Sequence, residues 1–295
     1  MRIGVVEIGG AHRLALVEDD RFRVAPAAAG DLVDLARGGS VALATFQNAA
    51  RGFETVPFDR HLLRAPLRRF RRDILCAGWN YWDHFEEGRG RRDGQEVDRP
   101  EHPTFFTKGP DTVVDPDGPI AYDPALSTKW DYEVEVALVI GRDGRSITEE
   151  SALDHVFGYC LANDISQRDL QRAHGGQWLK GKSIDQTMPF GPWITTADAV
   201  APDAIDIACE VNGERLQDAS TALMAFPIAT LIAELSRGMT LRAGDLLLTG
   251  TPAGVGNART PPLFLKEGDM VVSSSPQLGA LHNRMTRVDL TRPTA

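Results

Sequence analysis

Apolar residues recur at every second position in several short segments of the chain, and this spacing predicts a protein built mainly of strands. The clearest example is residues 131–140, where alternate positions from Val134 to Ile140 are all apolar. Such a run predicts a strand buried in a sheet. Glu133 and Glu135 lie at its start, and because side chains two positions apart share one face of a strand, both carboxylates point the same way.

The Glu133 and Glu135 carboxylates would lie only about 7 Å apart along such a strand. Two like charges this close, beside a core strand, repel each other and lose solvation, and a divalent cation removes that cost. Hard oxygen ligands of this kind suit Mg²⁺, Mn²⁺ or Ca²⁺. A strand end whose carboxylates point into water explains the same pattern, so the pair alone leaves both interpretations open.

The first 70 residues predict a small β-rich module that precedes a catalytic domain expected over residues 71–295. The module should contain three short strands and one helix, at residues 3–8, 14–17, 22–24 and 31–37. Four arginines between residues 68 and 72 are too few for a nucleic-acid footprint and predict a solvated linker or a salt-bridged surface. A short apolar strand at residues 74–78 follows.

Residues 88–102 are almost wholly polar, so they predict a surface loop within a lid around residues 80–102. Further along, Asn212-Gly213 predicts a hairpin with a type I′ turn. Helical patterns are expected at residues 149–155, 169–174 and 227–235. Because strands dominate without a regular βαβ rhythm, the chain predicts an α+β, β-rich fold of rolled or sandwiched sheets.

Composition narrows the classes of function. The chain has 295 residues, of which 42% are hydrophobic, and this suffices for a large buried core. Its net charge of −9 argues against a nucleic-acid partner. No apolar run approaches the ~18 residues that span a membrane, and the N-terminus lacks a signal-peptide pattern. The cysteines lie singly in apolar runs and predict buried free thiols, which favours a cytoplasmic location: Cys76, Cys160 and Cys209.

His84 and Glu87 are candidates for acid–base chemistry. They lie three residues apart where a short helix is expected, so they would be neighbours on one helix face. A carboxylate beside a histidine orients the ring and raises its basicity, as a general base requires. A surface histidine near a helix end is the alternative.

A third carboxylate, Asp164, follows an apolar strand pattern and can join the glutamate pair or cap the next helix. Arg168 and Gln171, again three residues apart, can face a substrate together, and arginine binds a carboxylate with two hydrogen bonds. For Arg168 the alternative is an ion pair with Asp169 or another surface acid.

Two glycine-containing segments are candidates for binding an anion, and their sequence contexts differ. Residues 176–183 match the Gly-x4-Gly-Lys-Ser pattern of a phosphate loop, but no apolar strand precedes them and no helical run follows, so the match is attributed to chance. The turn at residues 249–256 can present backbone N–H groups and the hydroxyls of Thr249 and Thr251 to an anionic oxygen. An ordinary Gly-Pro turn is the alternative.

Taken together, these segments resemble the fumarylacetoacetate hydrolase family, in order, over roughly residues 74–285. The motifs that carry the resemblance are Gly-x-Asn-Tyr-x-Asp-His (78–84), Asp-Tyr-Glu-x-Glu (131–135), Asn-Asp-x-Ser-x-Arg-Asp-x-Gln (163–171), Gly-Lys-Ser (181–183) and Thr-Gly-Thr-Pro-x-Gly-Val-Gly (249–256). The resemblance implies a mixed β-roll catalytic domain that is usually dimeric.

The resemblance also implies a role for each candidate residue. A divalent metal, Mg²⁺ or Mn²⁺ with Ca²⁺ able to replace it in crystals, would be held by Glu133, Glu135 and Asp164. His84 and Glu87 on a lid helix would handle water or a proton, and Lys182 would stabilise an enolate or oxyanion. The positions expected to line the substrate site are Arg168, Gln171, Thr251 and Tyr81.

The function implied is a metal-dependent hydrolase that cleaves a C–C bond of a 2-oxo or 1,3-diketo acid of the acylpyruvate type, through a metal-stabilised enolate. Residues 75–80 lack the further aspartate of the animal hydrolases that name the family, so the chain is more similar to the shorter bacterial and mitochondrial branch. Two alternatives stay open. One is a decarboxylase or isomerase/tautomerase of a 2-oxo or 2-hydroxymuconate-type diacid, and the other is a non-catalytic binding protein that keeps the fold.

Overall fold

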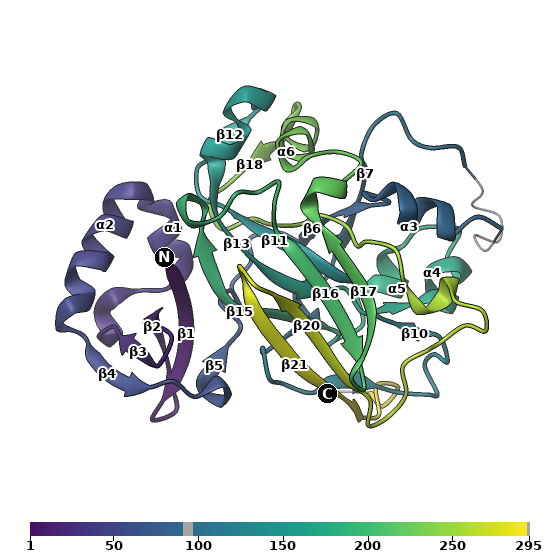
Figure 1. Cartoon of the computed structure of the whole chain (residues 1–295), viewed down its shortest axis with the longest axis horizontal. Helices are drawn as coiled ribbons and strands as arrows, with labels where there is room; N and C mark the ends of the chain where they lie inside the picture. Colours follow the sequence, from purple (N-terminus) through teal and green to yellow (C-terminus); the bar gives the residue numbers. More distant parts are fainter. Residues whose placement is uncertain (91–96, 294–295) are drawn as a thin grey trace.

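A large mixed sheet runs through the computed structural model, which describes residues 1–90 and 97–293 (Figure 1). Its main path is β4 (Glu54–Pro57), β3 (Arg21–Val24), β2 (Ala11–Val17), β1 (Arg2–Ile8), β15 (Met188–Thr196), β13 (Val156–Asn163), β11 (Val134–Ile140), β19 (Leu246–Leu248), β6 (Ile74–Gly78) and β7 (Thr104–Lys108). Two short strands attach beside it, β5 (Leu63–Arg64) on β1 and β8 (Val113–Val114) on β15. The three strands expected near the N-terminus are therefore present as β1, β2 and β3.

The N-terminal strands continue the sheet of the catalytic part, because β1 pairs antiparallel with β15, with Arg2 opposite Thr195. They also have a small core of their own, formed by residues such as Val6 and Phe22. A boundary near residue 70 remains a prediction, since the two parts share hydrogen bonds across one sheet.

A second sheet packs on the middle of the first, and the α+β architecture of sandwiched sheets is confirmed. Its strands follow the order β17 (Glu214–Ser220), β16 (Asp206–Val211), β20 (Met270–Ser275), β21 (Gly279–Arg287) and β9 (Ile120–Tyr122). The main core lies between the sheets and joins Val134 and Val136 of β11 to Ile207 of β16 and Leu281 of β21.

Strand β11 is buried on both faces, which explains why every residue after Glu135 in it is apolar. Val134 and Val136 face the second sheet, whereas Ala137 and Val139 belong to a different core on the opposite face. The strand is shorter than the sequence predicts, because the chain changes partners: Trp130–Asp131 forms β10, which pairs with β14 (Ser166–Gln167), and β11 starts only at Val134.

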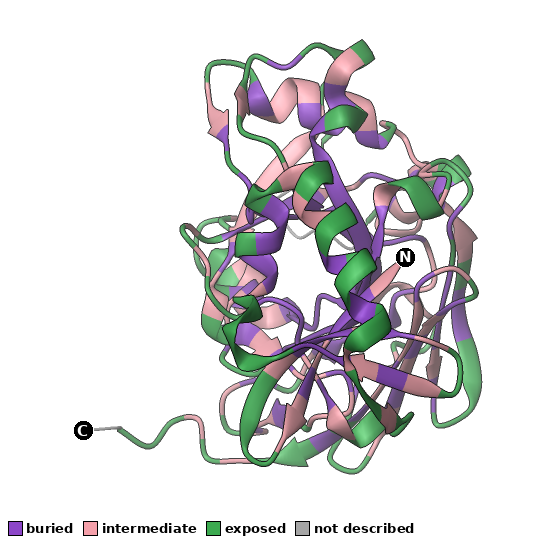
Figure 2. Cartoon of the chain, turned by 90° about the vertical axis from the view of Figure 1, so that its left-hand side faces the viewer, coloured by how far each residue is buried: buried purple, intermediate pink, exposed green. Residues whose placement is uncertain are grey.

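The helices lie at the edges of the sheets (Figure 1): α1 (Leu32–Arg37), α2 (Gly39–Ala49), α3 (Trp82–Glu87), α4 (Arg168–Ala173), α5 (Leu179–Lys182) and α6 (Ile228–Ser236). The expected helix at 31–37 forms, with the Asp31 side chain capping it by accepting from the Asp34 N–H. The segment Glu149–His155 is a 3₁₀ helix rather than an α-helix. Helix α2 was not predicted, because Phe46 is its only buried residue. Figure 2 shows the N-terminal helices facing the viewer, and much of their outer side is exposed.

Several local predictions are confirmed. Asn212 and Gly213 have φ values of 53° and 83°, as a type I′ turn requires. The arginine cluster is salt-bridged, for example from Arg68 to Asp115 and from Arg72 to Asp245. All three cysteines are buried and free. In the lid, residues 91–96 lie outside the described part of the chain, and no helix of the described residues is long and apolar enough to cross a membrane.

Close packing between β13 and β15 makes Gly158 a sensitive position. A Cβ atom there would overlap the Thr195 carbonyl oxygen and lie 2.6 Å from Ile194 Cγ2. We predict that Gly158→Ala lowers the free energy of unfolding by about 1–3 kcal/mol. Gly52→Ala is the matched control, since nothing lies within 4 Å of the added Cβ. Urea unfolding of both variants tests this, and equal stability of the two would contradict it.

Candidate metal centre and active site

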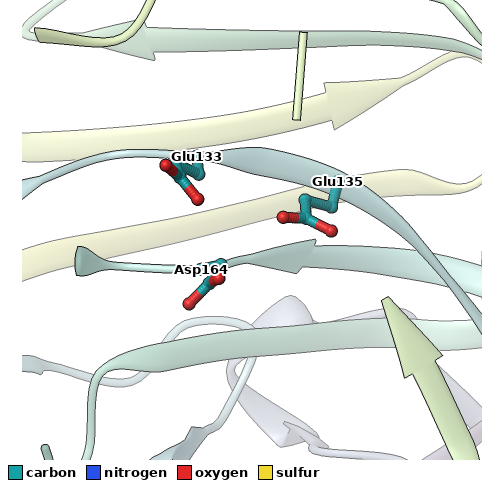
Figure 3. Close-up of side chains that lie close together, drawn as sticks. All are labelled: Glu133, Glu135 and Asp164. Carbon is teal, nitrogen blue, oxygen red and sulfur yellow. The ribbon is translucent and has the colours of Figure 1, made fainter. Parts of the chain in front are cut away.

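Three buried carboxylates meet where β11 begins and β13 ends (Figure 3). Glu133 precedes β11, Glu135 is its second residue, and Asp164 directly follows β13. The strands are antiparallel neighbours, with Val134 opposite Asn163, so the start of one meets the end of the other. One oxygen from each carboxylate lies within 4.8 Å of the others. The structure thus brings together the three residues that the sequence predicts as metal ligands.

Main-chain and amide groups hold these carboxylates in position. The Gly250 N–H donates to Glu135 Oε2 at 2.6 Å. The Asn163 side chain accepts from the Glu133 N–H at 2.9 Å and donates to Ser273 Oγ of the second sheet, also at 2.9 Å. Asn163, which the sequence did not single out beyond its motif, therefore ties the segment that carries Glu133 to both sheets.

Three buried cations surround the carboxylates. Lys182 Nζ donates to Asp164 Oδ2 at 2.7 Å and also to Glu133 Oε2. Lys108 Nζ lies 2.8 Å from Asp164 Oδ1. Arg168 Nη2 lies 2.6 Å from Glu133 Oε1, so each of the three cations compensates part of the acidic charge.

Arg168 is anchored by Asp131 as well, through Nε at 2.8 Å. Asp131 is fully buried and also accepts from the Gly256 N–H. The expected alternative, a surface pair with Asp169, is wrong, because Asp169 accepts instead from the Ser127 hydroxyl. Asp131 was missed as a functional residue, although it belongs to the Asp-Tyr-Glu-x-Glu motif.

The two glutamates differ in their electrostatic surroundings. Burial, together with the charges of Asp164 and Glu133, raises the pKa of Glu135 well above its usual value. For Glu133 burial acts in the same direction, but the charges of Arg168 and Lys182 outweigh it and lower its pKa to about 2. The carboxylates of Asp164 and Glu133 likewise outweigh burial for Lys182 and raise the pKa of its ammonium.

His84 and Glu87 form the predicted pair on α3, with His84 Nδ1 2.8 Å from Glu87 Oε1. Glu87 Oε2 also accepts from the Gly254 N–H at 2.8 Å, which ties the helix to the turn at 249–256. The other nitrogen of the His84 ring is therefore the one available to a substrate. This is the geometry of an oriented acid–base histidine.

Two small adjoining cavities connect this pair with the carboxylates. The outer one has about 70 Å³ and is lined by residues that include His84, Glu87 and Gln171. The inner one has about 40 Å³ and reaches Glu133, Glu135, Lys182 and Thr251. His84, Arg168 and Gln171 line both. A larger cavity of about 920 Å³ lies elsewhere, between the N-terminal helices and the catalytic sheet, and contains none of these candidates.

The remaining candidates for substrate binding, Thr249, Thr251 and Tyr81, are placed less directly for contact with a substrate. Thr249 and Thr251 donate their hydroxyl hydrogens to the Val136 and Val134 carbonyls, so their presentation to an anion stays a prediction. Thr251 still lines the inner cavity. Tyr81 is buried and lines neither cavity, and its hydroxyl has no hydrogen-bond partner among the described residues. Burial, followed by the Glu135 charge, raises the pKa of Tyr81.

The Gly-x4-Gly-Lys-Ser segment does not form a phosphate loop. Helix α4, not a strand, precedes it, and its Gly181-Lys182 ends the four-residue helix α5. A Cβ at Gly181 would overlap the Gln171 backbone, so this glycine allows α5 to pack on α4. The segment thereby delivers Lys182 to the carboxylates.

Comparisons with known proteins agree with this geometry. The model of the fumarylacetoacetate (FAA) hydrolase C-terminal domain matches residues 73–286. The chain is 43% identical to oxaloacetate tautomerase YisK of Bacillus subtilis over 76% of this chain and 72% of that protein. It is 38% identical to the mitochondrial oxaloacetate tautomerase Fahd2a of Rattus norvegicus over 88% of this chain and 81% of that protein.

Solved structures show the same fold over nearly the whole chain. A fumarylacetoacetate hydrolase from Exiguobacterium antarcticum has 37% identity and a TM-score of 0.81, covering 98% of this chain and 100% of that one. Maleylpyruvate hydrolase from Sphingobium sp. SYK-6, solved with manganese (II) ion and pyruvate, has 26% identity and a TM-score of 0.78 over the same shares.

The raised pKa of Glu135 predicts that metal binding depends on pH. A carboxyl with a raised pKa keeps its proton where a free glutamate has lost it, so a bound cation must displace that proton. We expect Mn²⁺ affinity to rise as the pH is raised above the usual titration range of a glutamate, with proton release on binding. Glu133, with a pKa of about 2, stays ionised there and adds no pH dependence.

Calorimetric Mn²⁺ titrations in buffers of different ionisation enthalpy measure both quantities. His84→Gln is the control, because it replaces the imidazole near the carboxylates and should keep the effect. Affinity that is independent of pH, without proton release, would rule out a protonated Glu135.

Proposed function

The chain belongs to the fumarylacetoacetate hydrolase family, and on that premise we propose that it is a divalent-metal-dependent enzyme that converts a 2-oxo acid through an enol or enolate. Keto–enol tautomerisation of an oxaloacetate-type diacid is the leading reaction. The observation that carries the proposal is that Glu133 and Glu135 of the buried carboxylate triad line the same cavity as His84, which Glu87 orients. Relatives that are oxaloacetate tautomerases support this choice of reaction over C–C hydrolysis.

The donor set fits a hard divalent cation. Glu133, Glu135 and Asp164 offer only carboxylate oxygens, which suit Mg²⁺ and Mn²⁺. A bound divalent cation supplies a Lewis acid for the carboxylate and 2-oxo oxygens of the substrate. The Mn²⁺ found in the maleylpyruvate hydrolase neighbour is consistent with this donor set.

The remaining residues supply proton transfer and charge. His84, oriented by Glu87, takes a proton from C3 of the keto acid, and the same proton is returned to the 2-oxygen to complete the enol. Lys182 lies at the inner cavity and stabilises the negative charge on that oxygen. Arg168 is held by Asp131 and Glu133, so it acts mainly by fixing Glu133, and Gln171 orients the substrate from the cavity wall.

C–C bond hydrolysis is the second candidate. Glu87 has both carboxylate oxygens engaged, one by His84 and one by the Gly254 N–H, so the pair is rigid enough to orient an attacking water. The likeness to maleylpyruvate hydrolase supports this reading. A decarboxylase would use the same enolate without the water. A non-catalytic binding protein is disfavoured, because such a protein has no need of the acid–base pair.

The proposal also includes a cytoplasmic location, a homodimeric assembly and a small 2-oxo acid as the substrate.

Replacing Glu135 by Gln tests the metal dependence. The variant keeps the size of the side chain but removes a charged ligand, so we expect Mn²⁺ affinity to fall by more than ~100-fold and turnover to be lost. The fold should survive, because the amide oxygen of glutamine can still accept from the Gly250 N–H. Glu214→Gln is the control at an exposed site. Wild-type turnover that persists in excess EDTA would refute metal dependence.

His84→Ala separates the candidate reactions. We expect oxaloacetate tautomerisation and acylpyruvate hydrolysis to fall ~10²–10⁴-fold, since both need the base. Oxaloacetate decarboxylation should fall much less, because it draws mainly on stabilisation of the enolate. The three rates are measured on one preparation, with the exposed His102→Ala as control. If all three rates fall by the same factor, His84 is not the general base. The rates of the wild-type protein show which of the three reactions it catalyses best.

A further inference from the structure

A second lysine lies behind the carboxylate triad, and its role was not evident from the sequence. Lys108 is the last residue of β7, and its side chain is 0% exposed. Its ammonium lies 2.8 Å from Asp164 Oδ1 and donates to the main-chain carbonyls of Ile165, at 3.3 Å, and of Lys182. The ammonium thus makes two hydrogen bonds to carbonyl groups, and its contact with Asp164 Oδ1 is an ion pair without a hydrogen bond.

We propose that Lys108 is a positioning residue that orients Asp164 and the backbone of Lys182 for metal binding. The inference rests on the proposed metal site. Lys108 does not line either cavity, so it acts through its neighbours and does not touch the substrate. Its position links three segments that are distant in sequence: the end of β7, the residues after β13 and the end of α5.

The two lysines divide the carboxylate of Asp164 between them. Lys182 takes Oδ2 and bridges it to Glu133, so Oδ2 is the oxygen on the side of the other ligands. Lys108 lies 2.8 Å from Oδ1, an ion-pair contact without a hydrogen bond, and its charge restrains the rotation of the carboxylate from that side. A cation that binds the triad therefore competes with Lys182 for the ligand oxygens, whereas Lys108 keeps its contacts and presents Oδ2 in a fixed orientation.

This arrangement gives the two lysines opposite effects on metal affinity. If Lys108 acted only as a positive charge near the site, its removal would tighten Mn²⁺ binding by relieving repulsion. If it orients a ligand, its removal weakens binding, and the loss of an outer partner of a metal ligand typically lowers affinity 10–100-fold. The sign of the change therefore distinguishes positioning from charge alone.

The experiment is a Mn²⁺ titration of the full chain, followed by the electron paramagnetic resonance signal of free Mn²⁺. We expect Lys108→Met to weaken binding 10–100-fold and Lys182→Met to bind at least as tightly as the wild type. Lys180→Met, which removes an exposed charge from the same short helix, should leave affinity unchanged. Lys108→Met with wild-type or tighter affinity overturns the proposal.

Lys108→Arg keeps the charge in a larger, planar group that cannot reproduce the three contacts, and it covers the case in which Lys108→Met does not fold. We expect it to weaken Mn²⁺ binding as well, and wild-type affinity in this variant would overturn the proposal. Titrations well below the melting temperature separate positioning from fold stability, because a purely structural role leaves the affinity of the folded protein unchanged. If the wild-type protein does not bind Mn²⁺, the metal site itself is rejected. If Glu135→Gln loses Mn²⁺ binding but the Lys108 variants keep it unchanged, only the role of Lys108 is rejected.

Discussion

Burying three carboxylates within 4.8 Å of one another is the constraint on which the rest of the site depends. Each carboxylate loses its hydration and repels the others, so the fold must supply compensating groups. Lys108, Lys182 and Arg168 provide positive charge, and a raised pKa allows Glu135 to hold a proton. The elements around the site are placed so that these groups converge on the triad.

The need to compensate the buried carboxylates explains why several separate elements of the fold converge on the triad. β7 ends in Lys108, α5 ends in Lys182 and α4 begins with Arg168, so one terminus of each element delivers one cation. Asn163 then joins the Glu133 backbone to the second sheet. Charge compensation thus comes from segments spread over much of the chain, and the site forms only when the sheets have packed.

The sequence predicted the parts of the molecule that local patterns specify. Two-residue periodicity identified β11, and Asn-Gly identified the hairpin turn, because both depend on neighbouring residues. The acidic ligands lie at the ends of adjacent strands, and their motifs made them recognisable. Lys108 was missed, since a lysine at the end of a strand usually reaches solvent, and only pairing of β7 with β6 buries it beside Asp164. Helix α2 was missed because only Phe46 of its residues is fully buried and its apolar residues form no clear stripe.

The turn at residues 249–256 holds two parts of the site by separate N–H groups. Gly250 donates to Glu135, and Gly254 donates to Glu87 of helix α3. The two bonds are independent of each other, so the contact of α3 with the turn can be lost while the contact with Glu135 is kept. If the proposed roles hold, substitutions in α3 would alter which carbon skeleton is accepted while the proposed ion-binding residues stay as they are.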